Sequence, residues 1–333
     1  MRCYGASHIP CIAKKYTSRY KSFICQCPVY KVSAIATIGF FDGVHQGHRY
    51  LFDQLRKYAD QYDERPLIFT FLQHPRSVLA KDCPPLLTTV QEREQLLGQF
   101  GDVHFFDFAE VQPLTAAQFL DYLADRWKVR HLLMGYNHHF GSDGHMTDDQ
   151  YESVAQNYGI HIVRAQPFSE NGSTPSSTVI RKLLIQGDIH EANKLLGYEY
   201  AMTGRVVHGR MIGRKIGFPT ANIVPEPDKL VPAAGVYKAV VSANNVWPVT
   251  DSEKLALVNI GTNPTVGNTH QTIEVHIPGF DGDLYNQSLT MHFSTRLRAE
   301  KCFASLDELK AQIQKDYETI YPSFDAQPHA GSM

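Results

Sequence analysis

AIATIGFFDGVHQGH, residues 34 to 48, decides the fold of the first half of this chain. It begins with Ala34 to Ile38, an apolar run of strand length that ends at a glycine. Apolar residues then recur at helical spacing from Leu51 to Ala59, so we expect a helix to begin near Gly47. A strand, a glycine turn and a helix N-terminus gather free backbone N–H groups, and such a site favours an anion.

The turn also carries two histidines. His45 and His48 are three residues apart, so both side chains can lie on one side of the first helical turn. Two imidazoles there could hold a triphosphate and stabilise charge that moves between phosphates. The glycines Gly39, Gly43 and Gly47 would let phosphate oxygens approach the backbone. A glycine turn before a helix is common, however, and HQGH by itself fits a structural histidine equally well.

The composition is that of a globular protein with two domains. The chain has 333 residues, of which 43% are hydrophobic and 20% charged. A net charge of −2 gives no reason to expect nucleic acid or an anionic membrane as a partner. No apolar run approaches the ~18 residues of a membrane helix. We therefore expect small-molecule ligands, no nucleic acid, no membrane and no obligatory protein partner.

The cysteines indicate a reducing compartment, and the first 33 residues have an unusual composition. Six cysteines, four of them before residue 28, do not form the pattern of a disulfide framework. We expect free thiols and a cytoplasmic location. Residues 1–33 contain Lys and Arg but no Asp or Glu, a composition also found in transit peptides. We favour a poorly ordered N-terminal extension.

From Ala34 to Gly197, strands and helices alternate. The apolar runs predict strands at 34–38, 66–71, 103–106, 131–134 and 160–165, and the capping and periodicity signals predict helices after 89, after 115, at 148–158 and at 188–196. This alternation predicts a Rossmann-like parallel sheet with helices on both faces and ligands beyond the carboxyl ends of its strands.

After residue 201 the pattern changes to short β-rich runs. They lie at 203–207, 236–241, 256–260, 272–277 and 289–293, separated by Gly, Pro and Asn. They predict an antiparallel barrel or sandwich, closed by a helix from Ser305 to about Tyr317. The predicted organisation is an extension at 1–33, an α/β domain at 34–197, a mainly antiparallel β-barrel domain with a C-terminal helix at 198–321, and a tail at 322–333.

The second half has its own candidate site. Residues 204–222 read GRVVHGRMIGRKIGFPTAN, a basic, glycine-rich segment that suits a polyphosphate but is also typical of a tight barrel loop. Thr220 offers a hydroxyl and Asn222 an amide oxygen, both of which can ligate Mg²⁺ or contact a phosphate. Glu274 lies in a strand-like stretch, where a carboxylate is expected only if it is exposed or functional.

Several of these stretches resemble known signatures. GFFDGVHQGH resembles the GxFDGxHxGH signature of the nucleotidyltransferase superfamily, most closely its FAD synthetase branch, and His74-Pro75 and SSTVIR resemble later motifs of that branch. PTAN, GVYKA, NIGTNPT, IEVHI, FDGDLY and LRAEKCF resemble riboflavin kinase motifs, in the same order. From residue 34 to 321, the chain resembles bacterial bifunctional riboflavin kinase/FAD synthetases, also called FMN adenylyltransferases.

This resemblance implies two successive reactions. The C-terminal domain would transfer the γ-phosphoryl group of ATP to riboflavin, giving FMN. The N-terminal domain would adenylylate FMN with ATP, giving FAD and pyrophosphate. ATP is then a co-substrate, Mg²⁺ a cofactor, and FMN and FAD are product and substrate.

The resemblance also implies roles for individual residues. Catalytic roles fall to Glu274, His45, His48 and Arg181. Metal ligation falls to Thr220 and Asn222. The implied flavin-binding residues are His74, Pro75, Asn137, Asn259 and Arg298. The implied ATP-binding residues are Gly39, Phe41, Gly43, Gly47, Ser177, Thr178, Gly209, Gly213, Lys215, Gly217 and Asn222. One departure lies in GYNHHFG, where His138 stands at a position that is commonly aromatic in the family.

Two other functions remain open at this point. The first is a nucleotidyltransferase with a different phosphate acceptor, against which the FPTAN and IEVHI stretches argue. The second is a flavin- or nucleotide-binding regulatory protein without turnover. It is disfavoured because all the residues with implied catalytic or metal-binding roles are present, namely His45, His48, Arg181, Thr220, Asn222 and Glu274.

Overall fold

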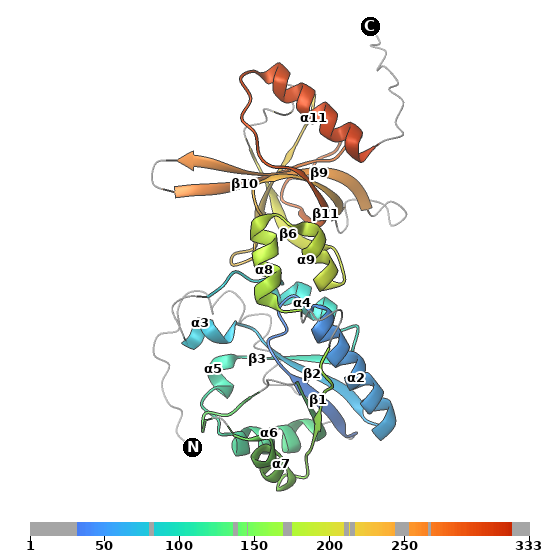
Figure 1. Ribbon diagram of the computed structural model, residues 1–333, viewed down its shortest axis with the longest axis vertical. Coiled ribbons are helices and arrows are strands. Elements are labelled where there is room, and N and C mark those ends of the chain that lie inside the picture. Colours follow the sequence, from blue (N-terminus) through green and yellow to red (C-terminus); the bar gives the residue numbers. More distant parts are fainter. Residues whose placement is uncertain are drawn as a thin grey trace. The chain divides into compact units, whose positions relative to one another are not determined.

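The computed structural model describes residues 32–79, 83–135, 139–144, 146–168, 175–209, 213, 217–243, 253–265 and 268–321. The chain forms two compact units. The first unit takes its described residues from Met1–Pro84 and Val90–Thr174, and the second from Pro85–Thr89 and Pro175–Met333 (Figure 1).

The first unit contains the predicted parallel sheet. Its strands pair in the order β3-β2-β1-β4-β5, and every pairing is parallel. Its elements are β1 (Ala34–Ile38), α2 (Gln46–Tyr62), β2 (Arg65–Phe71), α3 (Pro75–Leu79), α4 (Val90–Leu97), β3 (Asp102–Phe106), α5 (Phe108–Val111), α6 (Ala116–Trp127), β4 (Val129–Met134), α7 (Asp148–Gln156) and β5 (His161–Arg164).

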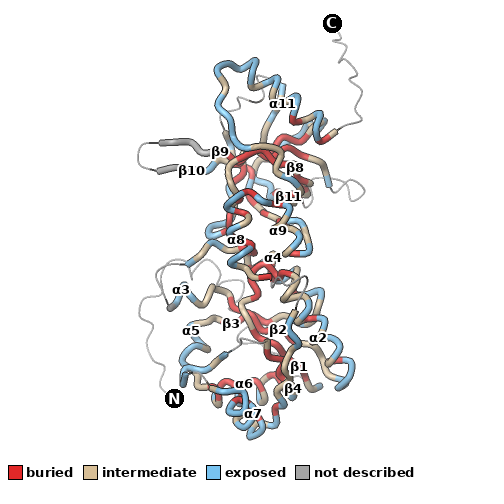
Figure 2. Tube along the Cα trace, viewed as in Figure 1, coloured by how far each residue is buried: buried red, intermediate tan, exposed pale blue. Residues whose placement is uncertain are grey.

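The central strands of this sheet are buried on both faces. All five residues of β1 are buried, and they divide by the two-residue period of a strand (Figure 2). Ala34, Ala36 and Ile38 pack into the core that contains residues of α6 and α7. Ile35 packs into the core that contains residues of α2. The helices therefore cover opposite faces, which confirms the predicted α/β architecture (Figure 1).

The second unit contains a closed antiparallel barrel with strand order β10-β7-β6-β11-β8-β9. It is closed by the pairing of β9 with β10. Its elements are α8 (Ser177–Gln186), α9 (Ile189–Leu196), β6 (Tyr200–Val207), β7 (Ala221–Pro225), β8 (Gly235–Ala243), β9 (Glu253–Thr265), β10 (Asn268–His276), β11 (Ser288–Arg298) and α11 (Leu306–Ile320). Strand β7 was not predicted, because Ile223 is its one buried residue and its periodicity signal is weak.

Helices cover the barrel. Buried residues of α8 and α9 share one core with the barrel interior. The side chain of Asn193 joins α9 to strands β6 and β11. Its amide donates to the carbonyl of Phe293 at 2.8 Å and its oxygen accepts from the N–H of Tyr200 at 2.8 Å. Ile320 of α11 packs with Val236 and Leu257 in a separate cluster.

A short segment from the first half of the chain also packs in the second unit. Leu87 is buried in the barrel core, and Leu86 forms a parallel bridge with Lys229. The buried ammonium group of Lys229 donates to the carbonyl of Leu87 at 2.6 Å and lies 4.6 Å from the ring centroid of Tyr200. Residues 85–89 therefore belong to the barrel by packing, although they lie between α3 and α4 in the sequence.

The packing boundary differs from the sequence boundary predicted near residue 197. The change from helical to β-rich pattern does fall there, between α9 and β6. The two compact units divide earlier, at Thr174 and Pro175, because α8 and α9 pack on the barrel. The domain limits predicted from the sequence remain a prediction about folding units.

Helix N-termini follow the predicted capping signals in part. Thr115 forms a full capping box with Gln118, as predicted. Ser305 accepts from the N–H of Glu308, but the carboxylate of Glu308 accepts from the N–H of Ala304, so this box is incomplete. Thr147 forms a capping box with Gln150 that was not predicted from the sequence.

Cysteines and helix hydropathy complete the description. Cys83 and Cys302, the cysteines within the described part of the chain, are both exposed free thiols. In that same part, every helix is too short or too polar to cross a membrane.

A buried histidine in β3 should make the first unit sensitive to acid. The ring centroids of His104 and Trp127 are 4.2 Å apart. Burial lowers the pKa of His104 to about 4. The unfolded chain binds this proton near pH 6.5, whereas the folded chain does not, so stability should fall as pH drops from about 6.5 to 4. The loss from this group is up to about 3 kcal/mol.

Urea unfolding at pH 7 and pH 5 measures this effect. Trp127 fluorescence reports the first unit in a Trp247→Phe background. We expect His104→Phe, which removes the titrating group, to lose less stability between the two pH values than the parent. Equal losses in both proteins would contradict the assignment.

Candidate functional site

The glycine turn of the first unit is tightly constrained. Between β1 and α2, Phe41 and Val44 have positive φ values of 53° and 37°. A buried β-branched residue such as Val44 rarely adopts this conformation, and strain of this kind concentrates at functional sites. A side chain at Gly39 would force the ring of Phe41 to move, because its Cβ would lie 2.7 Å from that ring.

His45 and His48 lie together at the start of α2. His45 is the N-cap, and its Nδ1 accepts from the backbone N–H of His48 at 3.4 Å. The two rings stack with centroids 3.6 Å apart, and the ring of Phe41 meets His48 edge-on at 5.2 Å. The Nδ1 of His48 is buried and has no hydrogen-bond partner among the residues that the structure describes.

Both histidines are neutral near pH 7. Burial lowers the pKa of His45 to about 4, although the nearby carboxylate of Asp42 opposes the shift. Burial and the neighbouring His45 lower the pKa of His48 well below its usual value. Because the Nδ1 of neutral His45 accepts a hydrogen bond, its proton lies on Nε2. The pair can therefore stabilise an anion by N–H donation together with the α2 N-terminus, whose first turn contains no acidic residue.

A cavity of about 430 Å³ lies at the carboxyl ends of β1 and β2. Its walls contain several aromatic rings. The lining residues are Ile38, Gly39, Phe40, Phe71, Pro75, Phe108, Val111, Gln112, Leu114, Phe119, His139, Phe140, Gly141 and Ser142. Aromatic walls of this kind suit a planar, conjugated ligand.

Buried polar groups hold the walls of this cavity in place. The hydroxyl of Tyr151 donates to the carbonyl of Phe140 at 2.7 Å and accepts from its N–H at 3.0 Å. Arg93, which is fully buried, donates to the carbonyl of Phe71 at 2.5 Å, and its guanidinium lies 4.2 Å from the ring centroid of Phe40. Neither Tyr151 nor Arg93 was predicted as a site residue, because no local sequence pattern identifies their partners.

The predicted flavin residues of this unit have mixed positions. Pro75 lines the cavity. His74 precedes it in the sequence, and the ring centroids of His74 and Phe40 are 4.6 Å apart. The Nδ1 of His74 accepts from the N–H of Arg76 at 3.0 Å. Asn137 and His138 lie outside the described residues.

In the second unit, a cavity of about 340 Å³ brings predicted residues together from across the barrel. Its polar wall includes Thr220, Asn259 and Glu274, and its apolar wall comes from strands and from α11. The lining residues are Gly213, Phe218, Thr220, Val236, Leu257, Asn259, Glu274, His276, Arg298, Glu300, Lys301, Phe303, Leu309, Ile313 and Asp316.

Thr220 and Glu274 make the central polar contact. The hydroxyl of Thr220 donates to Oε2 of Glu274 at 3.4 Å. In the ladder between β7 and β10, Asn222 is the register partner of Glu274, and Asn259 is its partner on β9. Sheet register therefore brings a hydroxyl, two amides and a carboxylate together.

A second and larger cavity, of about 620 Å³, shares Thr220 with the first. This cavity was not predicted from the sequence, although the FDGDLY stretch, residues 280–285, forms one side of it. The lining residues are Val206, Pro219, Thr220, Ala221, Val275, Ile277, Phe280, Asp281, Gly282, Asp283, Leu284 and Tyr285. Thr220 thus stands on the wall between two ligand-sized spaces.

Two glycines of the basic loop are required by close approach. A Cβ at Gly213 would lie 2.2 Å from the carbonyl oxygen of Phe218, and a Cβ at Gly209 would overlap the side-chain amide of Asn222. Gly217 has open space around it and a φ of +86°. Lys215 lies outside the described residues.

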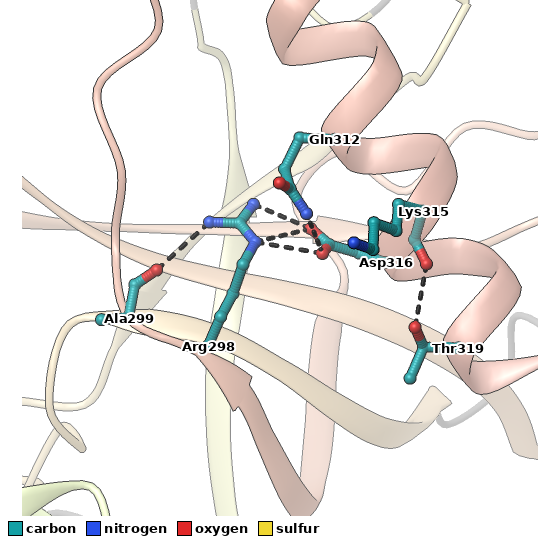
Figure 3. A network of polar contacts seen from close by, with 6 residues as sticks. All are labelled: Arg298, Ala299, Gln312, Lys315, Asp316 and Thr319. Atoms are coloured by element: carbon teal, nitrogen blue, oxygen red, sulfur yellow. Dashed lines mark hydrogen bonds and ion pairs between the residues drawn. The ribbon is translucent and has the colours of Figure 1, made fainter.

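Arg298 lines the smaller cavity, but its guanidinium is engaged within the protein (Figure 3). It forms a bidentate pair with the buried carboxylate of Asp316 on α11, at 2.7–3.0 Å. The amide of Gln312 also donates to Asp316, at 2.8 Å (Figure 3). Arg298 therefore joins β11 to α11, and its expected flavin contact remains a prediction.

The SSTVIR motif lies at the start of α8, in the second unit. Ser176 is the N-cap and accepts from the N–H of Val179. Ser177 and Thr178 follow in the first turn. Arg181 is buried, and its Nε donates to the carbonyl of Pro85 at 2.8 Å. This contact anchors the segment 85–89 and gives Arg181 a structural role in the second unit.

These sites define a class of protein: a two-unit chain with a helix N-terminus that favours an anion in its α/β unit and two cavities that share Thr220 in its β-barrel. A family model for FAD synthetase matches residues 28–179, and one for riboflavin kinase matches residues 196–324. The chain belongs to the family of bifunctional riboflavin kinase/FMN adenylyltransferases, which confirms the resemblance seen in the motifs.

Relatives that carry this description cover most of the chain. The protein of Escherichia coli strain K12 is 36% identical over 296 residues, which are 87% of this chain and 92% of the relative. That of Pseudomonas fluorescens is 35% identical over 85% of this chain and 90% of the relative, and that of Bacillus subtilis 30% identical over 86% and 91%. The chain is an enzyme with both activities of the family, and the non-catalytic and different-acceptor alternatives are not favoured.

A solved structure has the same fold. It is the crystal structure described as a macrolide-efflux protein from Streptococcus pneumoniae, with a TM-score of 0.76 and 28% identity. The match covers 89% of this chain and 96% of that one.

Proposed function

We propose that riboflavin is phosphorylated at the junction of the two barrel cavities. The smaller cavity offers apolar walls for a flavin ring beside Glu274, and the larger one offers room for a nucleotide. Thr220 lines both, so a phosphate that reaches Thr220 from the larger cavity would meet a hydroxyl held in the smaller one. The observation that carries this proposal is the contact between Thr220 and Glu274 on the shared wall.

In this arrangement Glu274 is the general base. Its carboxylate accepts the proton of the riboflavin 5′-hydroxyl while that oxygen attacks the γ-phosphorus of ATP. A bond forms between the 5′-oxygen and the γ-phosphorus, and the bond from the γ-phosphorus to the β–γ bridging oxygen breaks. ADP leaves with that electron pair, and the proton passes from Glu274 to solvent.

The donor set around Thr220 fits Mg²⁺. Thr220 and Asn222 would hold the ion, because a hydroxyl and an amide oxygen are hard donors. Among the described residues, no group of three or more His, Cys, Asp and Glu side chains could hold a metal. Two oxygen donors from the protein agree with Mg²⁺, which usually keeps several waters and binds substrate phosphates. When bound, the ion would neutralise charge on the phosphate oxygens.

For the second activity, we propose that the flavin ring of FMN occupies the aromatic cavity of the first unit. The triphosphate of ATP would lie at the N-terminus of α2, where His45 can donate through Nε2–H. An oxygen of the FMN phosphate attacks the α-phosphorus, an O–P bond forms, and the α–β bridging bond breaks to release pyrophosphate. No general base is required, because the FMN phosphate is already an anion. Catalysis then rests on positioning and charge stabilisation.

The proposal also includes the expected phosphate contacts of Ser177, Thr178 and Arg181. Ser177 and Thr178 present hydroxyls at the first turn of α8, where a phosphate is favoured. A triphosphate contact by Arg181 would have to coexist with its bond to Pro85. The partners are the small molecules riboflavin, FMN and ATP. A cytoplasmic location fits the free thiols of Cys83 and Cys302.

Incubation with riboflavin, ATP and Mg²⁺ tests the function. Chromatography of the flavins should show FMN and then FAD. Excess EDTA should stop both steps, and added Mg²⁺ should restore them, because each step moves charge between phosphate oxygens. Full FMN formation in EDTA would contradict the assignment of Mg²⁺ to Thr220 and Asn222. Bound but unchanged riboflavin would overturn the kinase proposal.

A further inference from the structure

His276 shares a strand face with Glu274. It is the last residue of β10, two positions after Glu274, and side chains two positions apart point to the same side of a strand. Both residues line the smaller barrel cavity. His276 is buried, and its Nδ1 lies 2.8 Å from the carbonyl oxygen of Pro219. A carbonyl can only accept a hydrogen bond, so Nδ1 carries the proton.

The two side chains hold consecutive residues of one loop. The ring of His276 contacts the ring of Phe218 edge-on, at 5.4 Å between centroids. The same ring donates to the carbonyl of Pro219, and Glu274 accepts from the hydroxyl of Thr220. One face of β10 therefore fixes three successive residues, of which the last stands between the two cavities.

This stretch of the loop has little regular structure of its own. Phe218, Pro219 and Thr220 belong to no helix or strand, and ladder pairing to β10 begins at Ala221. Before them, the N–H of Phe218 donates to the carbonyl of Gly213. The carbonyl of Pro219 belongs to the peptide unit that joins Pro219 to Thr220. A donor to this oxygen therefore sets the orientation of that peptide plane, and with it the place of the Thr220 side chain.

We propose that His276 is a positioning residue for the kinase reaction: its Nδ1–H fixes the Pro219–Thr220 peptide so that the Thr220 hydroxyl stays at the wall shared by the two cavities. This inference rests on the proposed kinase site. His276 acts through Thr220 and takes no proton from the substrate. Loss of the donor should lower kcat for FMN formation about 10- to 100-fold, the range for a lost hydrogen bond that shifts a reacting group.

Two amide substitutions test whether the N–H donor must lie at the place of Nδ1 or whether any donor at position 276 suffices. In His276→Asn the amide nitrogen can fall at the place of Nδ1, whereas in His276→Gln it falls near the place of Nε2. We expect His276→Asn to keep kcat within a few-fold and His276→Gln to show the 10- to 100-fold loss, together with a higher Mg²⁺ concentration for half-maximal rate. His292→Phe is the matched control, because His292 lies on β11 of the same barrel and lines neither cavity.

Two further measurements on the full chain complete the test. Quenching of riboflavin fluorescence without ATP reports the fold of the barrel cavity and should be similar in both amide variants. Equal kcat loss in His276→Asn and His276→Gln, or no loss in either, would overturn the donor role. A change in riboflavin KM at unchanged kcat would also overturn it, since that result assigns His276 to the cavity wall alone. Failure of the kinase proposal itself would appear separately, as an active Glu274→Gln variant.

Discussion

Glu274→Gln should lower the rate of FMN formation from riboflavin by about 10²- to 10⁴-fold, the usual contribution of a general base. Glutamine keeps the shape of the side chain, and its amide oxygen can still accept from the hydroxyl of Thr220. The variant therefore removes the proton acceptor and leaves the contact on the shared cavity wall in place. FMN-to-FAD conversion should stay nearly unchanged, because the glycine turn and its two histidines lie in the other compact unit.

The measurement is the yield of FMN and FAD over time, starting from riboflavin and separately from FMN. Glu253→Gln is a matched control, since Glu253 is an exposed residue of the same barrel that lines neither cavity. The two-site assignment would be wrong if Glu274→Gln blocked FAD synthesis from supplied FMN. The base assignment would be wrong if the variant phosphorylated riboflavin at the rate of the parent.

His48→Ala should have the opposite effect and stop the pathway at FMN. The substitution removes an imidazole at the first turn of α2, together with its stacking on His45 and its contact with Phe41. Losing one donor aimed at developing charge typically costs about 10²- to 10³-fold. Adenylylation of FMN should fall by that factor, while riboflavin should still be phosphorylated at nearly the rate of the parent.

The same flavin assay checks this result. His161→Ala is the control, because His161 begins β5 and so lies at the opposite end of the sheet from the carboxyl ends of its strands. Trp127 fluorescence verifies that the first unit is folded. A folded His48→Ala protein that makes FAD from FMN at the parental rate would refute the role of His48. Loss of its kinase activity would refute the separation of the two sites.

The neutral state of the two histidines changes how the anion site works. From the sequence alone, HQGH offers two imidazoles of unknown charge. The structure stacks them and buries them, and burial lowers both pKa values. Near pH 7, stabilisation of the triphosphate would come from N–H donors and the helix terminus. No imidazolium charge is needed.

The sequence by itself determined those features that depend on a few neighbouring residues, namely the secondary structure, the architecture of each half and the family. Apolar runs that alternate with helical periods predicted the parallel sheet, and short β-rich runs between Gly, Pro and Asn predicted the barrel or sandwich. The motif strings predicted the family. Each of these signals spans about ten residues, so it can be recognised without knowledge of the fold. The structure confirms the strand at 34–38 and the helix that follows its glycine turn.

Only the tertiary structure decided which distant groups meet. The guanidinium of Arg298 pairs with Asp316 on α11, and Leu87 packs in the barrel although it precedes α4 in the sequence. His276 gained its place from the carbonyl of Pro219, 57 residues earlier in the chain. Sheet register and helix packing set these partners, and burial in the folded unit lowers the pKa values of His45 and His48. Such long-range contacts produce no local period or motif. The residues that make them can be separated by any number of positions in the sequence, so no fixed spacing identifies them.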